Sequence, residues 1–124
     1  LHMHHHHNAL YPCNMHVTRY YPGQFFREHH DGFDKDQMDN DFSLIQRTWS
    51  ALLYLNDNYK GGYTNFHKVG KVIKPEEGKL IAWNNLIPGT SILNDDSEHS
   101  SEPVIEGNKW VALKLFLVSP FSLI

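Results

Sequence analysis

KWVALKLFLV, at residues 109–118, has the residue types of a β-strand. Successive side chains of a strand point to opposite faces, so Val111, Leu113 and Leu115 share one apolar face with Lys109 at its head. A lysine that begins an inward-facing apolar row needs an anion beside it, because burying an unpaired ammonium is costly. On these residues alone, the simplest partner is one of the chain's own carboxylates at the rim of the sheet.

Other blocks of strand-forming residues recur along the chain, separated by Gly, Pro, Asn and Asp. They lie at residues 15–21, 25–30, 45–55, 63–67, 71–73 and 79–83. The run 51–55 could be helical on periodicity alone, but the neighbouring Thr48, Trp49 and Tyr54 favour a strand. Many short strands at even spacing are typical of a β-sandwich or a barrel-like fold.

Two acidic segments, residues 31–41 and 95–106, lack a strand or helix pattern. The first contains five aspartates and Lys35 as its single base, and the second contains five acids and no base. Both are predicted to be polar, solvated loops.

Length and charge narrow the classes of protein. The 124 residues suffice for one domain. The formal net charge of −3, from 11 basic and 14 acidic residues, disfavours a nucleic acid or an anionic membrane surface as partner. The longest purely apolar run has five residues (51–55), which excludes a transmembrane helix, and the single Cys13 excludes an intrachain disulfide.

Histidines are concentrated at the start of the chain, where residues 2–7 contain five of the ten. This stretch resembles a purification tag and equally the cut end of a longer chain. Residues 1–13 are therefore predicted to be a tag-like or truncated N-terminal segment, and residues 14–124 to form the domain. No signal peptide is visible, and the compartment stays open.

A possible metal site begins in the segment Glu28-His29-His30-Asp31, at the end of a predicted strand. Side chains two residues apart share a face, so His29 lies with Asp31, and Glu28 with His30. Either pair offers an imidazole and a carboxylate to a divalent metal, and a third ligand has to come from elsewhere in the chain. A lone His-x-Asp is a weak motif.

Five motif blocks follow one another in order: YxxGQxFxxHxD (20–31), RxxSxLxYLN (47–56), GGYTNF (61–66), PxxGxLxxW (75–83) and HxxxPVxxGNKW (99–110). The ordered set closely resembles the catalytic domain of the prolyl 4-hydroxylase family of iron(II)- and 2-oxoglutarate-dependent dioxygenases, from Tyr20 to about Val118. The resemblance implies a mainly β fold for residues 14–124, a double-stranded β-helix (a cupin-like jelly roll) with the metal in its mouth.

The same resemblance implies the metal ligands. It places His29, Asp31 and His99 on the catalytic iron triad, which decides between the two possible pairs above. Two imidazoles and one carboxylate leave three open positions on iron(II), of which 2-oxoglutarate would take two and dioxygen the last. Lys109 matches the residue that anchors the far carboxylate of 2-oxoglutarate. The charges of iron, Asp31, 2-oxoglutarate and Lys109 then sum to zero, which favours burial of the assembly.

Three further residues match the family's cosubstrate pocket. Tyr54 matches a tyrosine that helps to bind the far carboxylate, and Tyr20 matches another that lines the pocket. Ser50 stands where the family commonly has Thr. Taken alone, each tyrosine is more simply a core residue. The other histidines, His16, His30 and His67, are assigned surface or packing roles, and Leu80, Trp83 and Trp110 are predicted to be core residues without a chemical role.

The resemblance implies hydroxylation of a C–H bond, most simply in a prolyl residue of a peptide or protein, with release of succinate and CO2 and with ascorbate keeping the iron reduced. Asp31 favours hydroxylation over halogenation. The alternative is a non-catalytic, cupin-like module that binds a metal or a ligand. Family domains usually carry a helical section before the Tyr20 strand, so this chain is expected to expose an apolar outer sheet face. The sequence leaves the substrate and the oligomeric state open.

Overall fold

A computed structural model describes residues 10–12 and 15–118, and every strand pair in it is antiparallel. The main sheet contains β1 (Leu10–Pro12), β2 (His16–Tyr20), β11 (Lys109–Val118), β4 (Arg47–Tyr54) and β8 (Leu80–Asn84). The second sheet has the order β3 (Phe26–His29), β9 (His99–Ser101), β6 (Thr64–Phe66) and β7 (Lys71–Ile73). A small ribbon pairs β5 (Lys60–Gly61) with β10 (Val104–Glu106).

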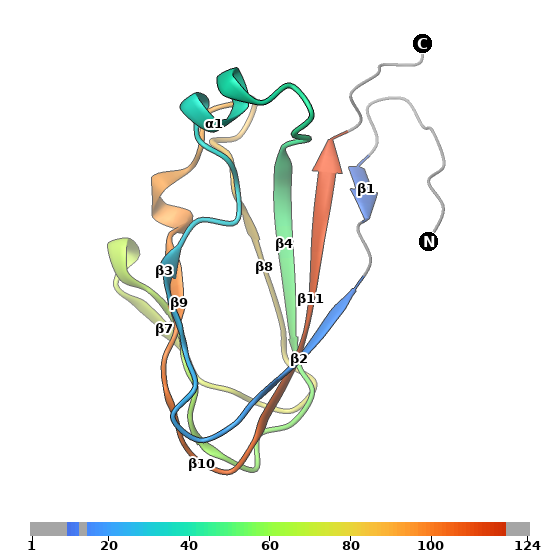
Figure 1. The fold of residues 1–124 in the computed structure, drawn as a ribbon. Helices are drawn as coiled ribbons and strands as arrows, with labels where there is room; N and C mark the ends of the chain where they lie inside the picture. Colours follow the sequence, from blue (N-terminus) through green and yellow to red (C-terminus); the bar gives the residue numbers. More distant parts are fainter. Residues whose placement is uncertain (1–9, 13–14, 119–124) are drawn as a thin grey trace.

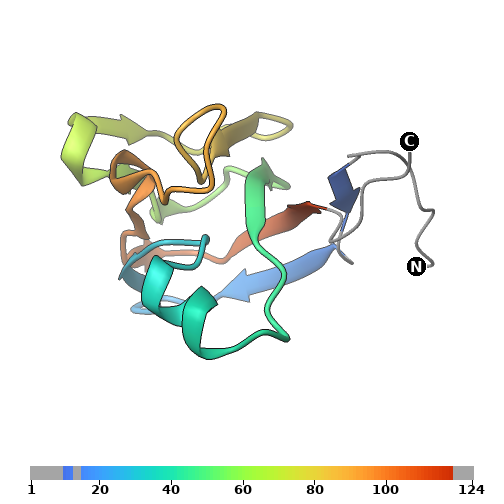
Figure 2. The same ribbon diagram turned by 90° about the horizontal axis from the view of Figure 1, so that it is seen from above.

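The two larger sheets form two layers that face each other, as Figures 1 and 2 show. The chain passes from one sheet to the other as it proceeds from β2 to β3 and then to β4, and again from β7 to β8 and to β9. Strands far apart in sequence therefore become neighbours, such as β2 with β11 and β3 with β9. The predicted mainly β jelly roll is confirmed.

The core lies between the two layers. Tyr54 on β4 and Val111 and Leu115 on β11 are buried, and the second sheet contributes Phe66. On β11 these residues belong to the row that Lys109 begins, and Lys109 itself is only 1% exposed. The buried row expected on one face of this strand is therefore present, and Ala112 on the opposite face is buried as well.

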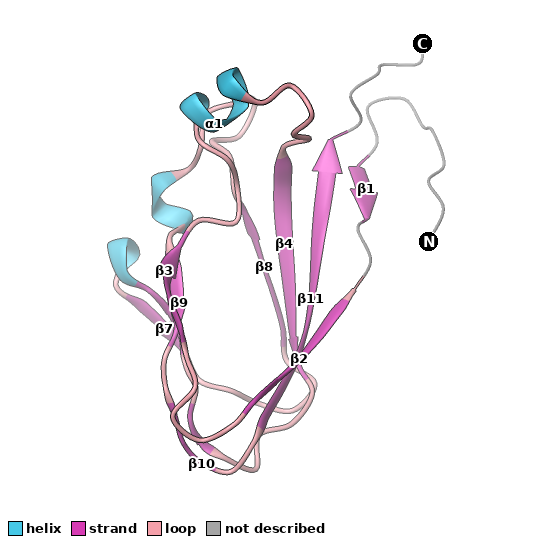
Figure 3. Cartoon of the chain, viewed as in Figure 1, coloured by secondary structure: helices cyan, strands magenta, loops and turns pink. Residues whose placement is uncertain are grey.

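Helical segments are short and lie outside the sheets (Figure 3). They are α1 (Lys35–Asn40) and the 3₁₀ turns η1 (His67–Val69) and η2 (Asp95–Ser97). None of the helices in the described part of the chain is long and apolar enough to cross a membrane.

The prediction of loops in the two acidic segments was wrong. Residues 31–41 contain α1, which a capping box begins: Asp34 Oδ1 accepts from Gln37 N at 2.8 Å, and Gln37 Oε1 accepts from Asp34 N at 2.9 Å. Residues 95–106 contain η2, β9 and β10. The polar composition of this segment suggested a loop, but β9 pairs with β3 and β6, and β10 pairs with β5. Pairing with distant strands cannot be predicted from a short local segment.

The outer face of the main sheet is apolar and exposed, as expected. Leu80 is 63% exposed, Val17 57%, Trp49 39% and Trp110 38%. The prediction that Leu80 and Trp110 are core residues was therefore wrong. Trp110 follows Lys109 directly on β11, so strand alternation turns it to the face opposite the core.

Of the predicted N-terminal segment 1–13, only residues 10–12 belong to the described part of the chain, where they pair with β11. The histidine stretch lies outside the described residues. The division into residues 1–13 and 14–124 stays a prediction.

Candidate metal centre and cosubstrate pocket

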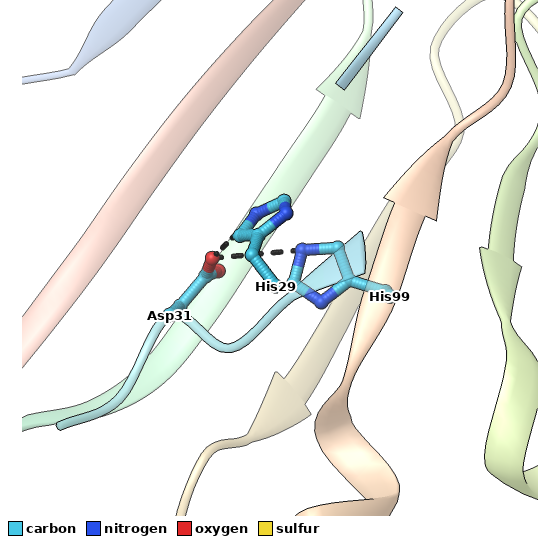
Figure 4. Close-up of side chains that lie close together, drawn as sticks. All are labelled: His29, Asp31 and His99. Carbon is cyan, nitrogen blue, oxygen red and sulfur yellow. Dashed lines mark ion pairs between the residues drawn. The ribbon is translucent and has the colours of Figure 1, made fainter. Parts of the chain in front are cut away.

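The three predicted metal ligands come together at one end of the second sheet. His29 ends β3 and His99 begins β9, and the register pairs these two residues directly. Asp31 follows His29 by two residues. Asp31 Oδ1 lies 3.2 Å from His29 Nε2 and 3.5 Å from His99 Nε2, and the three possible ligand atoms are all within 4.8 Å of one another (Figure 4).

Both imidazoles are oriented by backbone carbonyl groups. His29 Nδ1 lies 2.7 Å from the carbonyl oxygen of Arg27, and His99 Nδ1 lies 2.7 Å from that of Ser97. A carbonyl oxygen only accepts hydrogen bonds, so each Nδ1 donates its proton to a carbonyl group, and a ring that is neutral has its lone pair at Nε2, beside Asp31. Histidines that bind a metal usually donate their other ring N–H to a carbonyl or carboxylate group in this way.

The site shifts the pKa values of its three candidate ligands in different directions. Burial alone would raise the pKa of Asp31, but the hydrogen bond from His29, the charge of His99 and the hydrogen bond from Ser50 together lower this pKa below its usual value. Burial lowers the pKa of His99, which favours its neutral form. Burial also lowers the pKa of His29, but the hydrogen bonds with Asp31 and with the carbonyl group of Arg27 outweigh it and raise this pKa, so a metal ion would displace a proton there. An ionised carboxylate and a neutral imidazole are the forms that ligate a divalent ion.

His30, the alternative ligand in the sequence, belongs to another cluster. Its Nε2 lies 3.2 Å from Asp95 Oδ1, and Asp95 also binds Lys68. His67 Nε2 lies 2.7 Å from Ser100 Oγ. Among the described residues, only His29, Asp31 and His99 converge as a possible metal site.

A cavity of about 110 Å³ extends from the triad into the space between the sheets. The three candidate metal ligands line it, and so do Lys109 and Tyr20. Its apolar wall includes Leu52, Val111 and Leu113. The cavity therefore offers one small molecule both a candidate metal site and a buried cation.

Lys109 lies deep in this cavity without a counter-ion. Its Nζ donates to the carbonyl oxygen of Gly62 at 2.8 Å and to Ser101 Oγ at 2.6 Å, and it lies 4.8 Å from the centre of the Tyr20 ring. No described carboxylate makes an ion pair with it, so the structure does not contain the rim pair considered above. Burial lowers its pKa to about 8. The ammonium has three donors and two partners, which leaves one donor for a ligand.

Gly62 lets the backbone approach Lys109 this closely. Its φ of +69° is in the left-handed region, and a Cβ at this position would lie 2.9 Å from Lys109 Cδ. The GGYTNF block therefore has a packing role beside the lysine as well as a turn role.

The other predicted cosubstrate residues lie at different places. Tyr20 lines the cavity, and burial raises the pKa of its phenol. Tyr54 is fully buried, with its hydroxyl 2.5 Å from Thr64 Oγ1 and its ring centre 6.0 Å from Lys109 Nζ. Ser50 Oγ donates to Asp31 Oδ2 at 2.6 Å and so lies behind the metal ligand. Direct binding of 2-oxoglutarate by these three residues stays a prediction.

Sequence reasoning missed two aromatic neighbours of the triad. Phe26 stacks on His29 with ring centres 3.9 Å apart, and Trp83, predicted to be core without a chemical role, lies edge-on to His99 at 4.8 Å. Both residues line the cavity. Phe26 stands in the first motif block, three residues before His29, which was the available signal.

Comparison with known proteins agrees with this site. The profile of the 2OG-Fe(II) oxygenase superfamily matches residues 15–117. A putative prolyl 4-hydroxylase of Acanthamoeba polyphaga mimivirus is 31% identical over 112 residues, covering 88% of this chain and 46% of the relative. The prolyl 4-hydroxylase subunit alpha-1 of Gallus gallus is 33% identical over 100 residues, covering 79% of this chain and 19% of the relative. The chain thus spans less than half the length of these two relatives.

Solved structures show the same fold. The viral collagen prolyl hydroxylase of Paramecium Bursaria Chlorella virus-1, in its 2OG complex, superposes with a TM-score of 0.79 at 28% identity, covering 91% of this chain and 63% of that one. A Pseudomonas putida prolyl-4-hydroxylase gives a TM-score of 0.59 at 25% identity, covering 83% and 51%. With its triad, its buried lysine and its jelly roll, this chain belongs to the 2OG-Fe(II) oxygenase superfamily and is similar to its prolyl 4-hydroxylases.

Proposed function

We propose that this chain hydroxylates a C–H bond of a prolyl residue in a peptide or protein. One oxygen atom of O2 enters the product and the other enters succinate, which forms with CO2 when 2-oxoglutarate is decarboxylated. The observation that carries the proposal is the cavity that joins the triad His29, Asp31 and His99 to the buried, unpaired Lys109. The prolyl substrate is supported by the names of relatives at 31% and 33% identity.

The donor set fits iron(II). His29 Nε2, His99 Nε2 and Asp31 Oδ1 would hold the ion, which is the 2-His-1-carboxylate set of non-haem iron oxygenases, and bound iron supplies the redox chemistry that activates O2. Ascorbate as the reductant that keeps this iron in its ferrous state is part of the proposal.

The protein's own residues bind and orient the cosubstrate. The free donor of Lys109 would bind the far carboxylate of 2-oxoglutarate, and the triad that lines the same cavity would receive its keto acid group. The apolar walls formed by Leu52, Val111 and Leu113 exclude water, which strengthens the charge pair.

The decisive test is anaerobic titration with iron(II) and 2-oxoglutarate, followed by addition of O2 and proline-containing peptides. A visible charge-transfer band before O2, with succinate and hydroxyproline after it, supports the proposal. A band with succinate but no hydroxylated peptide retains the dioxygenase and rejects the prolyl substrate. Metal binding without a band or succinate favours the alternative, a non-catalytic cupin-like binding module.

Affinity for 2-oxoglutarate should fall as the pH rises above about 8. Lys109, whose pKa burial lowers to about 8, is protonated below this pH and attracts the far carboxylate, but is neutral above it. The apparent Kd should rise by up to about tenfold per pH unit and level off above the higher pKa that the complex has. Equilibrium titration at a series of pH values, with iron saturating and O2 excluded, measures this.

Lys109→Arg is the matched control, because the guanidinium stays charged and its binding curve should be flat over the same range. The free energy of unfolding of the protein without cosubstrate should increase as the pH rises over this range, whereas the affinity for 2-oxoglutarate falls. The pKa of Lys109 is lowered from 10.5 on folding, so the unfolded chain binds more protons between about 8 and 10.5, and stability rises with pH there. A Kd independent of pH would show that Lys109 does not contact the cosubstrate as a cation.

A further inference from the structure

Asn85 is an unexpected polar residue in the core behind the triad. It is 0% exposed and follows the last residue of β8. Its backbone is held on both sides: its N–H donates to the carbonyl oxygen of Thr48 at 2.7 Å, and its carbonyl accepts from Asn94 N at 2.8 Å. Its side-chain Oδ1 is buried and has no partner among the described residues. Burying an unpaired amide oxygen costs free energy. We therefore expect the NH2 group of the same amide to make an interaction that offsets this cost.

The amide donates into a chain of hydrogen bonds that ends at a metal ligand. Asn85 Nδ2 donates to Ser50 Oγ at 2.9 Å, and Ser50 Oγ donates to Asp31 Oδ2 at 2.6 Å. Ser50 is also 0% exposed, so water does not compete for its hydroxyl. The opposite orientation of the amide would place two acceptors, Asn85 Oδ1 and Asp31 Oδ2, against one hydroxyl proton. The donor at Asn85 therefore directs that proton to Asp31.

This chain of bonds makes the two oxygens of Asp31 different. Oδ2 accepts the short hydrogen bond from Ser50, whereas Oδ1 lies near both Nε2 atoms, at 3.2 Å from His29 and 3.5 Å from His99. A carboxylate in this state presents one oxygen to an ion. A carboxylate free to rotate can present both and would then occupy a position that a bidentate cosubstrate or O2 requires.

We infer that Asn85 is a positioning residue that acts through Ser50 to keep Asp31 a monodentate ligand. The claim that a monodentate Asp31 leaves positions open for the cosubstrate and O2 rests on the proposed function. The claim that Asn85 supports metal binding does not. The packing agrees with it: a Cβ at Gly32 would lie 3.3 Å from Asn85 Cβ and 2.8 Å from Leu93 Cδ1. The backbone directly after Asp31 therefore packs against Asn85 and Leu93.

The experiment compares Asn85→Leu, Ser50→Ala and the double variant by titration with Co2+, in the absence of 2-oxoglutarate. Loss of a second-shell partner typically weakens metal binding by about 10–100-fold, and we expect this for each single variant. The double variant should bind Co2+ as tightly as the single variant with the lower affinity, because both residues act through the same hydrogen bond to Asp31. The visible spectrum of bound Co2+ should also change at saturation, since it reports coordination number.

Asn108→Leu is the matched control, because it makes the same change at another amide whose Oδ1 is buried without a partner. Its Co2+ affinity and spectrum should equal those of the wild type. Ser50→Thr retains the hydroxyl and should retain most of the affinity that Ser50→Ala loses. If Asn85→Leu does not fold, this pair at position 50 carries the test alone: equal Co2+ affinity and spectra for Ser50→Ala and Ser50→Thr would overturn the inference.

The inference would also be overturned if Asn85→Leu had the Co2+ affinity and spectrum of the wild type. It would be overturned too if the losses of Co2+ affinity in the two single variants added up in the double variant, because additive losses indicate independent roles. A second measurement uses iron(II) at saturation without O2. There, Asn85→Leu should bind 2-oxoglutarate more weakly than the wild type, since a bidentate Asp31 competes for its positions. A wild type that binds Co2+ but not 2-oxoglutarate contradicts the proposed function, and the Co2+ comparison still decides the role of Asn85.

Discussion

Replacing His29, Asp31 or His99 by alanine should abolish tight iron(II) binding and all turnover. Each residue contributes one of the three ligand atoms that lie within 4.8 Å of one another, and the site has no described substitute for any of them. The loss should exceed the roughly 10–100-fold that removal of a second-shell partner causes, because a primary ligand is removed. Iron(II) titration under anaerobic conditions, with succinate formation as the activity measure, gives both quantities.

His30→Ala is the matched control for the triad, because it removes a neighbouring imidazole that pairs with Asp95 on the surface. Binding and turnover should remain close to those of the wild type. An inactive His30→Ala together with an active His29→Ala would mean that the strand is turned by one residue and presents the opposite face to the metal.

Lys109→Ala should lower the affinity for 2-oxoglutarate by about two to three decades, while iron(II) affinity without cosubstrate stays nearly unchanged. The substitution leaves the far carboxylate buried without its cation, which typically costs about 3–5 kcal/mol. Lys109→Arg should be intermediate, because it keeps the charge but is wider and forked. Equilibrium binding of 2-oxoglutarate with iron saturating and O2 excluded measures the effect.

Lys114→Ala controls for loss of a lysine elsewhere on β11, on the face opposite Lys109, and should bind 2-oxoglutarate like the wild type. Lys109→Met separates binding from folding. It removes a buried ammonium that lacks a counter-ion in the free protein, so this variant should be at least as stable as the wild type while losing the cosubstrate. A wild-type Kd in Lys109→Ala would contradict the assignment of this residue.

The fold could largely be predicted because its strands carry local patterns. The alternation of residues 109–118 places Lys109 and Val111 on one face, and the structure confirms this row. The capping box of Asp34 and Gln37 is also a local pattern, but the acidic composition of its segment favoured a loop. By contrast, β9 could not be found locally, because pairing with β3 and β6 makes His99–Ser101 a strand.

The sequence by itself left two possible pairs of metal ligands in residues 28–31, and only its resemblance to a known family, carried by five ordered motif blocks, predicted His29, Asp31 and His99. Only the tertiary structure decided what surrounds these ligands. The register of β3 against β9 sets His99 opposite His29, and the facing sheets leave Lys109 buried without a carboxylate. The chain of bonds from Asn85 through Ser50 to Asp31 joins three distant segments. Such contacts depend on non-local strand pairing, which no local pattern of residues specifies.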